Sequence, residues 1–143
     1  MSTLKNGIAW NDNLNIGYEH VDAQHRRLFQ LVNDLVVACE DGSDKVKLKN
    51  TIDFLVNYAV EHFYDEESVQ VQWNFPDYLA HKKRHDDFKV TVGEIVDKYN
   101  THGSTKELSD DVNRIVVRWI FSHIQNEDKR IGEFIRKTDS RFV

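Results

Sequence analysis

Two pairs of metal-binding side chains, each four residues apart, constrain the fold of this chain more than any other feature. His62 and Glu66 form the first pair, and His81 and His85 form the second. On an α-helix, residues i and i+4 lie on the same face, so each pair directs two ligand-type groups the same way. Pro76 lies between the pairs and cannot continue a helix as an interior residue. The sequence therefore predicts two antiparallel helices whose ligand-type groups face each other.

Apolar residues with helical spacing predict four long helices, each with a single apolar stripe. The connections between them are short, and the chain has only one proline and six glycines. Short connections place successive helices side by side and antiparallel. We therefore expect an all-α fold, an up-down-up-down four-helix bundle. Its helices are expected at about 20–40, 45–71, 76–99 and 105–136.

The 143 residues suit one compact domain, which we take as 1–143. Residues 1–19 are interpreted as an N-terminal arm that is ordered but irregular. Trp10 favours this interpretation, because an exposed tryptophan would leave a large apolar surface in water. The bundle itself is expected over 20–136, followed by a frayed tail over 137–143.

The composition excludes several classes of protein. The formal net charge of −5 argues against nucleic-acid binding, because phosphate neutralisation needs clustered Lys and Arg. The sequence has neither an apolar run of membrane length nor a secretory signal at its N-terminus, so membrane insertion is not expected. The single cysteine, Cys39, cannot form an intrachain disulfide and suits a reducing compartment. We therefore expect a cytoplasmic protein, and the charge pattern offers no obvious patch for a protein client.

Seven ligand-type side chains fall on the buried stripes of the four helices. The antiparallel order brings them to one depth, because each lies toward the same end of the bundle. Five imidazoles and two carboxylates are too many for one metal ion, but they suit two ions that share carboxylates. The set favours divalent iron, with manganese, cobalt or zinc as other occupants. The residues are His25, His62, Glu66, His81, His85, His123 and Asp128.

The last two of these residues break the helical spacing. His123 and Asp128 are five residues apart, and an ideal α-helix separates such positions by roughly 140°. A locally widened turn, as in a π-bulge, brings the two side chains closer in angle. We therefore predict that the fourth helix is widened at this point.

Four segments resemble the hemerythrin family, and its bacterial single-domain form in particular. These are VDAQH around His25, HFYDEE from His62, FPDYLAHKKRH through His85, and WIFSHIQNED through Asp128. The resemblance covers nearly the whole chain, and Trp10 in an N-terminal arm also fits it. All seven ligand positions of the family are present.

The resemblance implies a centre of two irons, bridged by Glu66, Asp128 and an oxo or hydroxo oxygen. One iron would keep an open position for dioxygen. Phe63, Trp119 and Ile120 are candidates for a dry wall around this position, although simple core packing explains them equally well. The histidines implied for the first iron are His81, His85 and His123, and those implied for the second iron are His25 and His62.

Several neighbouring polar residues have alternative interpretations. The family usually has Met four residues after the bridging Glu, where this chain has Gln70. We predict that Gln70 faces solvent at the bundle end; the alternative is a polar group near the site that admits water. Asp65 and Glu67 are interpreted as surface charges, and His20 and His102 as solvated. Asp22 and Gln24 either bond locally or support the His25 ring.

The donor set favours reversible dioxygen binding, for storage, delivery or sensing, over catalysis. Oxygen-activating di-iron bundles typically use four carboxylates with two Glu-x-x-His motifs. This chain has two carboxylates at the site and no such motif there. We therefore do not expect an enzyme. The alternatives are a di-iron enzyme that reduces peroxide or reacts with nitric oxide, and an iron- or oxygen-responsive interaction module.

Overall fold

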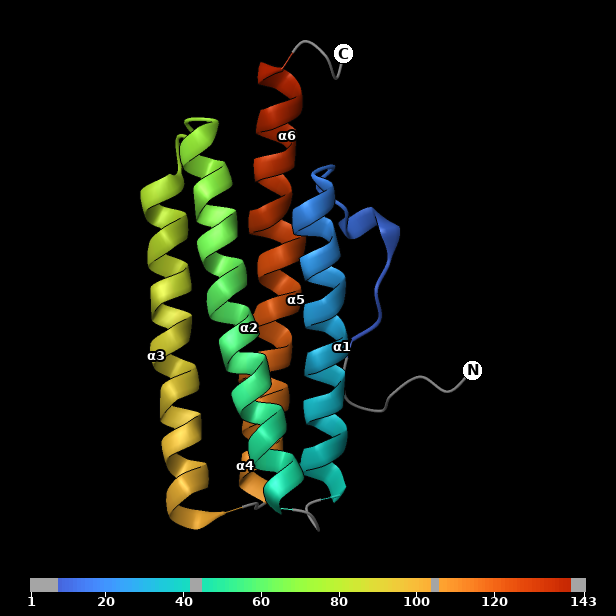
Figure 1. Cartoon of the computed structure of the whole chain (residues 1–143), viewed down its shortest axis with the longest axis vertical. Helices are drawn as coiled ribbons and strands as arrows, with labels where there is room; N and C mark the ends of the chain where they lie inside the picture. Colours follow the sequence, from blue (N-terminus) through green and yellow to red (C-terminus); the bar gives the residue numbers. More distant parts are fainter. Residues whose placement is uncertain (1–7, 42–44, 104–105, 140–143) are drawn as a thin grey trace.

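Four helical rods lie side by side in the computed structural model, which describes residues 8–41, 45–103 and 106–139 (Figure 1). The first three rods are α1 (Glu19–Asp41), α2 (Lys45–Gln72) and α3 (Tyr78–His102). In Figure 1 the chain runs down α1, up α2 and down α3, and it returns upward along the fourth rod. The described residues contain no strand, so the predicted all-α class is confirmed.

The fourth rod is continuous but alternates between α-helical and π-helical turns. Its second π-helical segment begins at His123 and ends at Asp128, which confirms the widened turn predicted from their spacing. The expected start of this rod at Thr105 lies outside the described residues, as do residues 140–143 of the expected tail. In chain order the segments are α4 (Lys106–Asp111), η2 (Val112–Val117), α5 (Arg118–Ser122), η3 (His123–Asp128) and α6 (Lys129–Thr138).

A tight turn joins α2 to α3. Asn74 has a positive φ of 54°, a conformation that asparagine tolerates better than most residues. The backbone N–H of Phe75 donates to the carbonyl of Gln70 at 2.9 Å, which closes the end of α2. Pro76 lies within this turn and not at the first helical position, so the predicted start of the third helix was two residues early.

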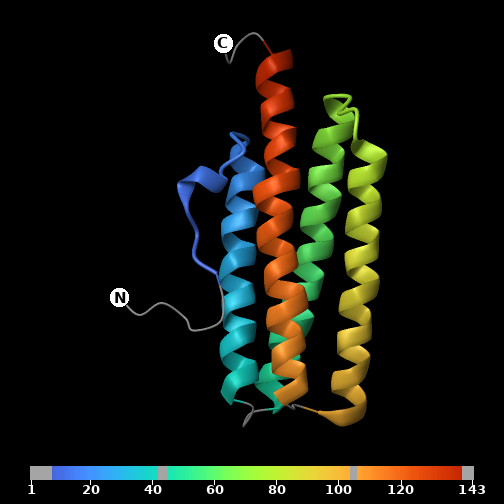
Figure 2. The ribbon, with the colours of Figure 1, turned by 180° about the vertical axis from the view of Figure 1, so that it is seen from behind.

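The segment before α1 lies along that helix (Figures 1 and 2). It contains a short 3-10 helix, η1 (Asp12–Leu14). The Trp10 ring packs edge-on against Phe29, with ring centroids 5.1 Å apart. The Asn33 side chain accepts from the Ile8 N–H at 3.0 Å and donates to the Ile8 carbonyl at 2.7 Å. These contacts attach the segment to the side of α1.

The same segment also closes one end of the bundle. The carboxylate of Asp22 accepts from the backbone N–H groups of Ile16 and Gly17, at 2.7 and 3.1 Å. Arg136 donates to the Ile16 carbonyl at 2.8 Å. The Ile16 side chain is buried in an apolar cluster at this end, which we call the end cluster. It consists of Ile16, Val21, Val69, Phe75, Ile131 and Ile135.

A belt of polar residues separates the end cluster from the larger main core. On α1, Val21 belongs to the end cluster and Leu28 to the main core, and His25 lies between them. On α2, Glu66 likewise lies between residues of the main core and residues of the end cluster, and on the fourth rod Asp128 does so. Apolar side chains thus enclose the belt from both ends and keep bulk water away from it.

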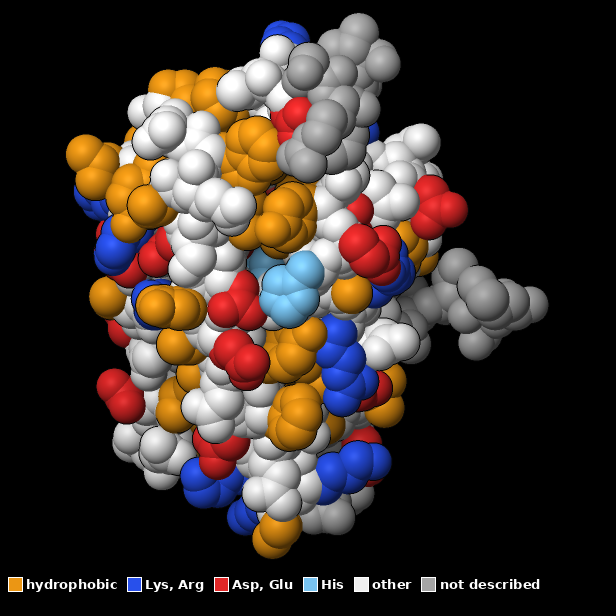
Figure 3. Space-filling view, turned by 45° about the horizontal axis from the view of Figure 1, so that its top comes forward, with side chains coloured by type: hydrophobic (Ala, Val, Ile, Leu, Met, Phe, Trp, Pro, Cys, Tyr) orange, Lys and Arg blue, Asp and Glu red, His pale blue; other side chains and the backbone are white. Residues whose placement is uncertain are grey.

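The surface has a mixed character. On the face shown in Figure 3, basic, acidic and hydrophobic side chains are interspersed, and the basic ones form only small groups. Nucleic-acid binding needs a continuous basic stripe or patch, which that face does not present. None of the described helices has an apolar stretch long enough to cross a lipid bilayer.

Candidate metal centre

The structure brings all seven predicted ligand residues together in the polar belt. Each is at most 5 % exposed. They form two groups, and within each group one ligand atom per residue lies within 4.8 Å of all the others. Glu66 and Asp128 belong to both groups. The first group adds His81, His85 and His123, and the second adds His25 and His62.

Glu66 lies between the two sets of histidines and contacts both. Its Oε2 atom is 3.1 Å from Nε2 of His25 and 3.2 Å from Nε2 of His62. Its Oε1 atom is 2.9 Å from Nε2 of His81 and 3.2 Å from Nε2 of His85. One carboxylate therefore reaches both sites with one oxygen each, which is the geometry that a bridging ligand requires.

Asp128 repeats this arrangement from the fourth rod. Its Oδ2 atom is 3.0 Å from Nε2 of His25, and its Oδ1 atom is 2.9 Å from Nε2 of His81 and 3.0 Å from Nε2 of His123. Both oxygens are buried without a hydrogen bond of good geometry. A buried carboxylate without such bonds is costly unless a cation neutralises it, so Asp128 fits a metal ion.

The hydrogen bonds around His62 show which of its nitrogens is free to bind a metal. Gln24 donates from Nε2 to the carboxylate of Asp65 at 2.8 Å, which leaves its Oε1 atom facing Nδ1 of His62 at 2.8 Å. Nδ1 must therefore donate, and Nε2 presents its lone pair toward Glu66. Two lone pairs that face each other 3.2 Å apart repel unless a proton or a metal ion lies between them, so this nitrogen is available as a metal ligand. Gln24 thus supports His62, whereas the sequence analysis expected local bonding or support of His25.

His85 shows the same pattern on the other side of the belt. Its Nδ1 atom lies 2.8 Å from the carboxylate of Glu67, which accepts only, so the proton is on Nδ1. Its Nε2 atom lies 3.0 Å from Nε2 of His123. The interpretation of Glu67 as a surface charge was wrong, because its side chain is only 13 % exposed and orients a ligand-type histidine. Such partners fix the ring and raise its basicity toward a metal.

The two carboxylates change the acid–base behaviour of the histidines that touch them. Burial favours the neutral form of His25 and His81, but their interactions with Asp128 and Glu66 outweigh it. The pKa of His25 rises to about 9, and that of His81 to about 10. Burial and Glu66 act to raise the pKa of Asp128, yet the imidazoles of His123 and His25 lower it overall. Without metal, the belt therefore balances its carboxylates with imidazolium protons.

Metal uptake should displace these protons, because a metal binds neutral imidazole. We expect at least two protons released per chain at about pH 7.5, which is below the raised pKa values of His25 and His81. Apparent affinity should fall as the pH falls, since more imidazoles then hold a proton. Calorimetry in two buffers of different ionisation enthalpy counts the protons. The exposed His102, at the end of α3, gives the control: His102→Gln should release the same number. Uptake without proton release would contradict this account.

Aromatic rings cover the side of the centre that faces the main core. The Phe63 ring stacks on His85 at a centroid distance of 4.0 Å, and the Trp119 ring stacks on His123 at 4.3 Å. Phe88, which the sequence reasoning did not include, stacks on Trp119 at 4.0 Å. Its position three residues after His85 was the available signal. Together with the buried Ile120, these side chains form an apolar wall beside the histidines.

Comparison with known proteins identifies this arrangement. The family model described as "Hemerythrin HHE cation binding domain" matches residues 16–135. The chain belongs to the hemerythrin family. Hemerythrins hold two irons and bind dioxygen, and the five imidazoles and two carboxylates of the belt fit such a centre.

Relatives and solved structures agree with the family assignment. A bacteriohemerythrin from Stenotrophomonas maltophilia (strain R551-3) is 30% identical over 136 residues, which cover 95% of this chain and 86% of the relative. A bacteriohemerythrin from Methylococcus capsulatus (strain ATCC 33009 / NCIMB 11132 / Bath) is 30% identical over 118 residues, covering 82% and 86%. A crystal structure of wild-type hemerythrin superimposes with a TM-score of 0.80 at 25% identity, covering 90% of this chain and 97% of that one.

Gln70 departs from the family pattern, and its predicted solvent exposure was wrong. The residue is fully buried, one turn beyond Glu66 on the same helix face. Neither its Nε2 atom nor its Oε1 atom has a hydrogen-bond partner. A buried amide in this condition destabilises the fold by about 1–3 kcal/mol per unpaired group. The alternative interpretation, a polar group beside the hemerythrin centre, is the one that the burial supports.

We therefore expect Gln70→Met to stabilise the protein by about 1–2 kcal/mol, because methionine has a similar shape and no strong polar group. It should also slow oxidation of the oxygenated form, since water loses its hydrogen-bonding site there. Thermal unfolding and the decay of the oxygenated spectrum provide the measurements. Gln72→Met changes an exposed residue at the end of α2 and is the control. A destabilised Gln70→Met protein would instead show that the amide holds a bound water or ligand.

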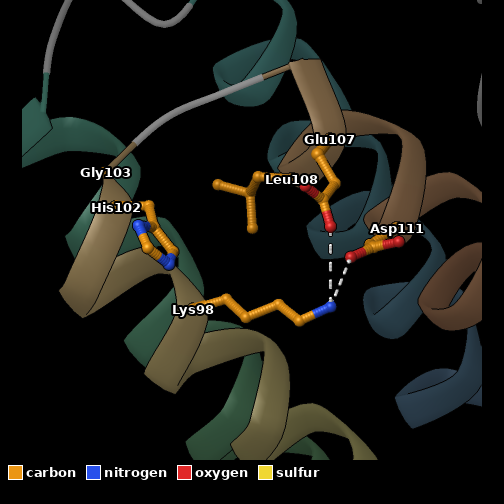
Figure 4. Close-up of a pocket in the computed structure, with 6 residues that line it drawn as sticks. All are labelled: Lys98, His102, Gly103, Glu107, Leu108 and Asp111. Carbon is orange, nitrogen blue, oxygen red and sulfur yellow. Dashed lines mark hydrogen bonds and ion pairs between the residues drawn. The ribbon is translucent and has the colours of Figure 1, made fainter.

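The other ionisable candidates lie apart from the hemerythrin centre. His20 is exposed and pairs with Asp65 at 3.1 Å, and His102 is exposed as predicted. His102 lines a surface pocket where α3 turns into α4, in which Lys98 forms ion pairs with two carboxylates (Figure 4). Cys39 is buried, and burial raises the pKa of its thiol to about 11, so the thiol stays protonated at neutral pH.

Proposed function

We propose that this chain binds dioxygen reversibly at a two-iron centre in the cytoplasm, for storage, delivery or sensing. The whole chain, 1–143, serves as one domain, with an up-down-up-down bundle and an N-terminal arm as the scaffold. The seven belt residues hold the irons. Glu66 and Asp128 bridge them. His81, His85 and His123 bind one iron, and His25 and His62 bind the other.

One observation carries this proposal: each belt carboxylate reaches both sets of histidines, with one oxygen toward each set. Iron held by such a donor set would supply the electrons needed to bind dioxygen. The protein supports this in three ways. Gln24 and Glu67 orient the rings of His62 and His85. The bridging carboxylates neutralise charge, and the apolar wall and end cluster exclude water.

The surroundings of the site favour binding over turnover. Phe63 and Ile120 on the wall cannot donate or accept a proton, and Trp119 stacks face to face on His123. Reduction of peroxide needs protons delivered to the leaving oxygen, usually by a positioned acid. A wall of this composition delivers no proton to bound dioxygen. Dioxygen is therefore released unchanged.

The test is anaerobic loading of the metal-free protein with ferrous iron, followed by a metal count and admission of oxygen. We expect two irons per chain and a change in visible absorption that removal of oxygen reverses. Bleaching to a stable ferric form, with peroxide released or consumed, would replace the carrier proposal with a peroxide- or nitric-oxide-reacting enzyme. One iron per chain, or none, would contradict the seven-ligand centre.

A further inference from the structure

An apolar pocket opens on the surface between α2 and α3, which lie beside each other in Figures 1 and 2. Its volume is about 250 Å³, and valine, alanine and phenylalanine side chains of both helices form most of its lining. Gly93 forms part of the opening: a Cβ atom at this position would meet no heavy atom within 4 Å. The pocket is therefore open to solvent where α3 lacks a side chain. We call it the α2–α3 pocket.

A smaller void lies behind this pocket, inside the main core. Its volume is about 30 Å³, and aliphatic and aromatic side chains from all four rods line it. The α2–α3 pocket and the void have several side chains in common, so a shift of these side chains connects them. The common residues are Val56, Ala59, Phe88, Val92 and Val96.

The void lies about one helical turn from the metal centre. Three of the residues that line the void come from different rods. Each is three positions from a belt histidine on the same rod. Such residues lie on neighbouring turns of one helix face. The pairs are Ala59 with His62, Phe88 with His85, and Ile120 with His123. Phe63, which stacks on His85, lines the outer pocket. The apolar space thus extends from the surface to the wall of the centre.

The lining decides which molecules can use this space. A cavity lined by aliphatic and aromatic groups gives water no hydrogen-bond partner and stays dry, whereas a small apolar molecule gains dispersion contacts there. The void has room for a diatomic molecule. At the other end of the belt, the buried side chains of Ile16 and Phe75 pack in the end cluster.

We propose that the α2–α3 pocket and the inner void form the path by which dioxygen reaches the centre, with Gly93 at its mouth. The path rests on the proposed function, since it leads dioxygen to the irons. It explains how a centre enclosed by apolar clusters admits a gas while excluding water and ions. Rare movements of Phe88 and Val92 open the boundary between pocket and void.

The first test uses the iron-loaded protein with Gly93→Leu, whose side chain covers the mouth. The rates of oxygen association and dissociation should both fall several-fold by the same factor. Equilibrium affinity should stay unchanged, because the bound state is untouched. Gly93→Ala adds only a methyl group and is the matched control. Equal rates in wild type and Gly93→Leu, or a change in affinity alone, would overturn the path. Self-association altered by Gly93→Leu would also overturn it, by marking the pocket as a contact between copies.

The second test needs no oxygen binding. Xenon under pressure, added to the zinc-loaded protein, should shift the methyl NMR signals of Val56, Val92 and Ile120, and Gly93→Leu should slow this response. If wild type binds dioxygen but xenon leaves these methyls unchanged, only the path fails. If wild type binds no dioxygen, the proposed function fails, and the dioxygen path falls with it, whatever xenon shows.

Discussion

Replacing Glu66 with alanine is expected to lower the iron content from two per chain to one or none. Glu66 lies within 3.2 Å of four of the five belt histidines and 4.0 Å from His123, and its two oxygens divide between the two sets. Without this carboxylate, neither site keeps its bridging ligand, and the charge of two divalent ions stays uncompensated inside an apolar shell. Binding of the second iron should be weakened most, because the two positively charged ions would then face each other without the negative charge of Glu66 between them.

Iron analysis after anaerobic loading and desalting measures this change. Glu66→Gln keeps the shape of the side chain but removes the charge, so it separates the loss of a ligand from the loss of packing. Glu61→Ala removes an exposed carboxylate from the same helix and should retain two irons. Two tightly held irons in both Glu66 variants would show that this residue does not bridge. Circular dichroism of the metal-free variants confirms that the bundle has formed.

Much of this site follows from helix geometry alone. The i, i+4 spacing of His62 with Glu66 and of His81 with His85 fixes which groups share a face, whatever the details of packing. The five-residue interval between His123 and Asp128 even indicates the widened turn of the fourth rod. These inferences succeed because each depends on the backbone of one helix.

The inferences that failed depend on contacts between helices. Glu67 follows Glu66 and lies about 100° around α2, which the sequence alone indicates to be the solvent-exposed side. In the structure α3 packs against this side and brings His85 to Glu67. Gln70 continues the stripe of Glu66, but its polarity favoured an exposed position, and only the packing of the end cluster shows that it is buried. Gln24 was expected to bond locally or to support His25, and only the packing of α2 against α1 shows that it supports His62. No spacing rule within one helix contains this information.

Gly132→Ala is expected to destabilise the protein by roughly 3 kcal/mol and to lower its melting temperature by about 10 °C. A Cβ atom at this position would lie 2.0 Å from the backbone carbonyl oxygen of Ile16, and also within 3 Å of its carbonyl carbon and Cβ. Backbone atoms cannot rotate away as a side chain does, so the arm must leave α6. The bonds from Arg136 and to Asp22 would then be lost or stretched.

Gly93→Ala provides a matched control, because it makes the same substitution in a helix but meets no neighbouring atom. It should stabilise the protein by about 0.5–1 kcal/mol through helix propensity alone, so the two variants should shift the melting temperature in opposite directions. The substitution should also affect the metal centre. Ile16 is part of the end cluster next to the metal belt, and its displacement would admit water to the belt. Gly132→Ala should therefore lose iron faster to a chelator than Gly93→Ala does. Equal melting temperatures and equal iron loss would show that the arm neither packs on Gly132 nor protects the centre.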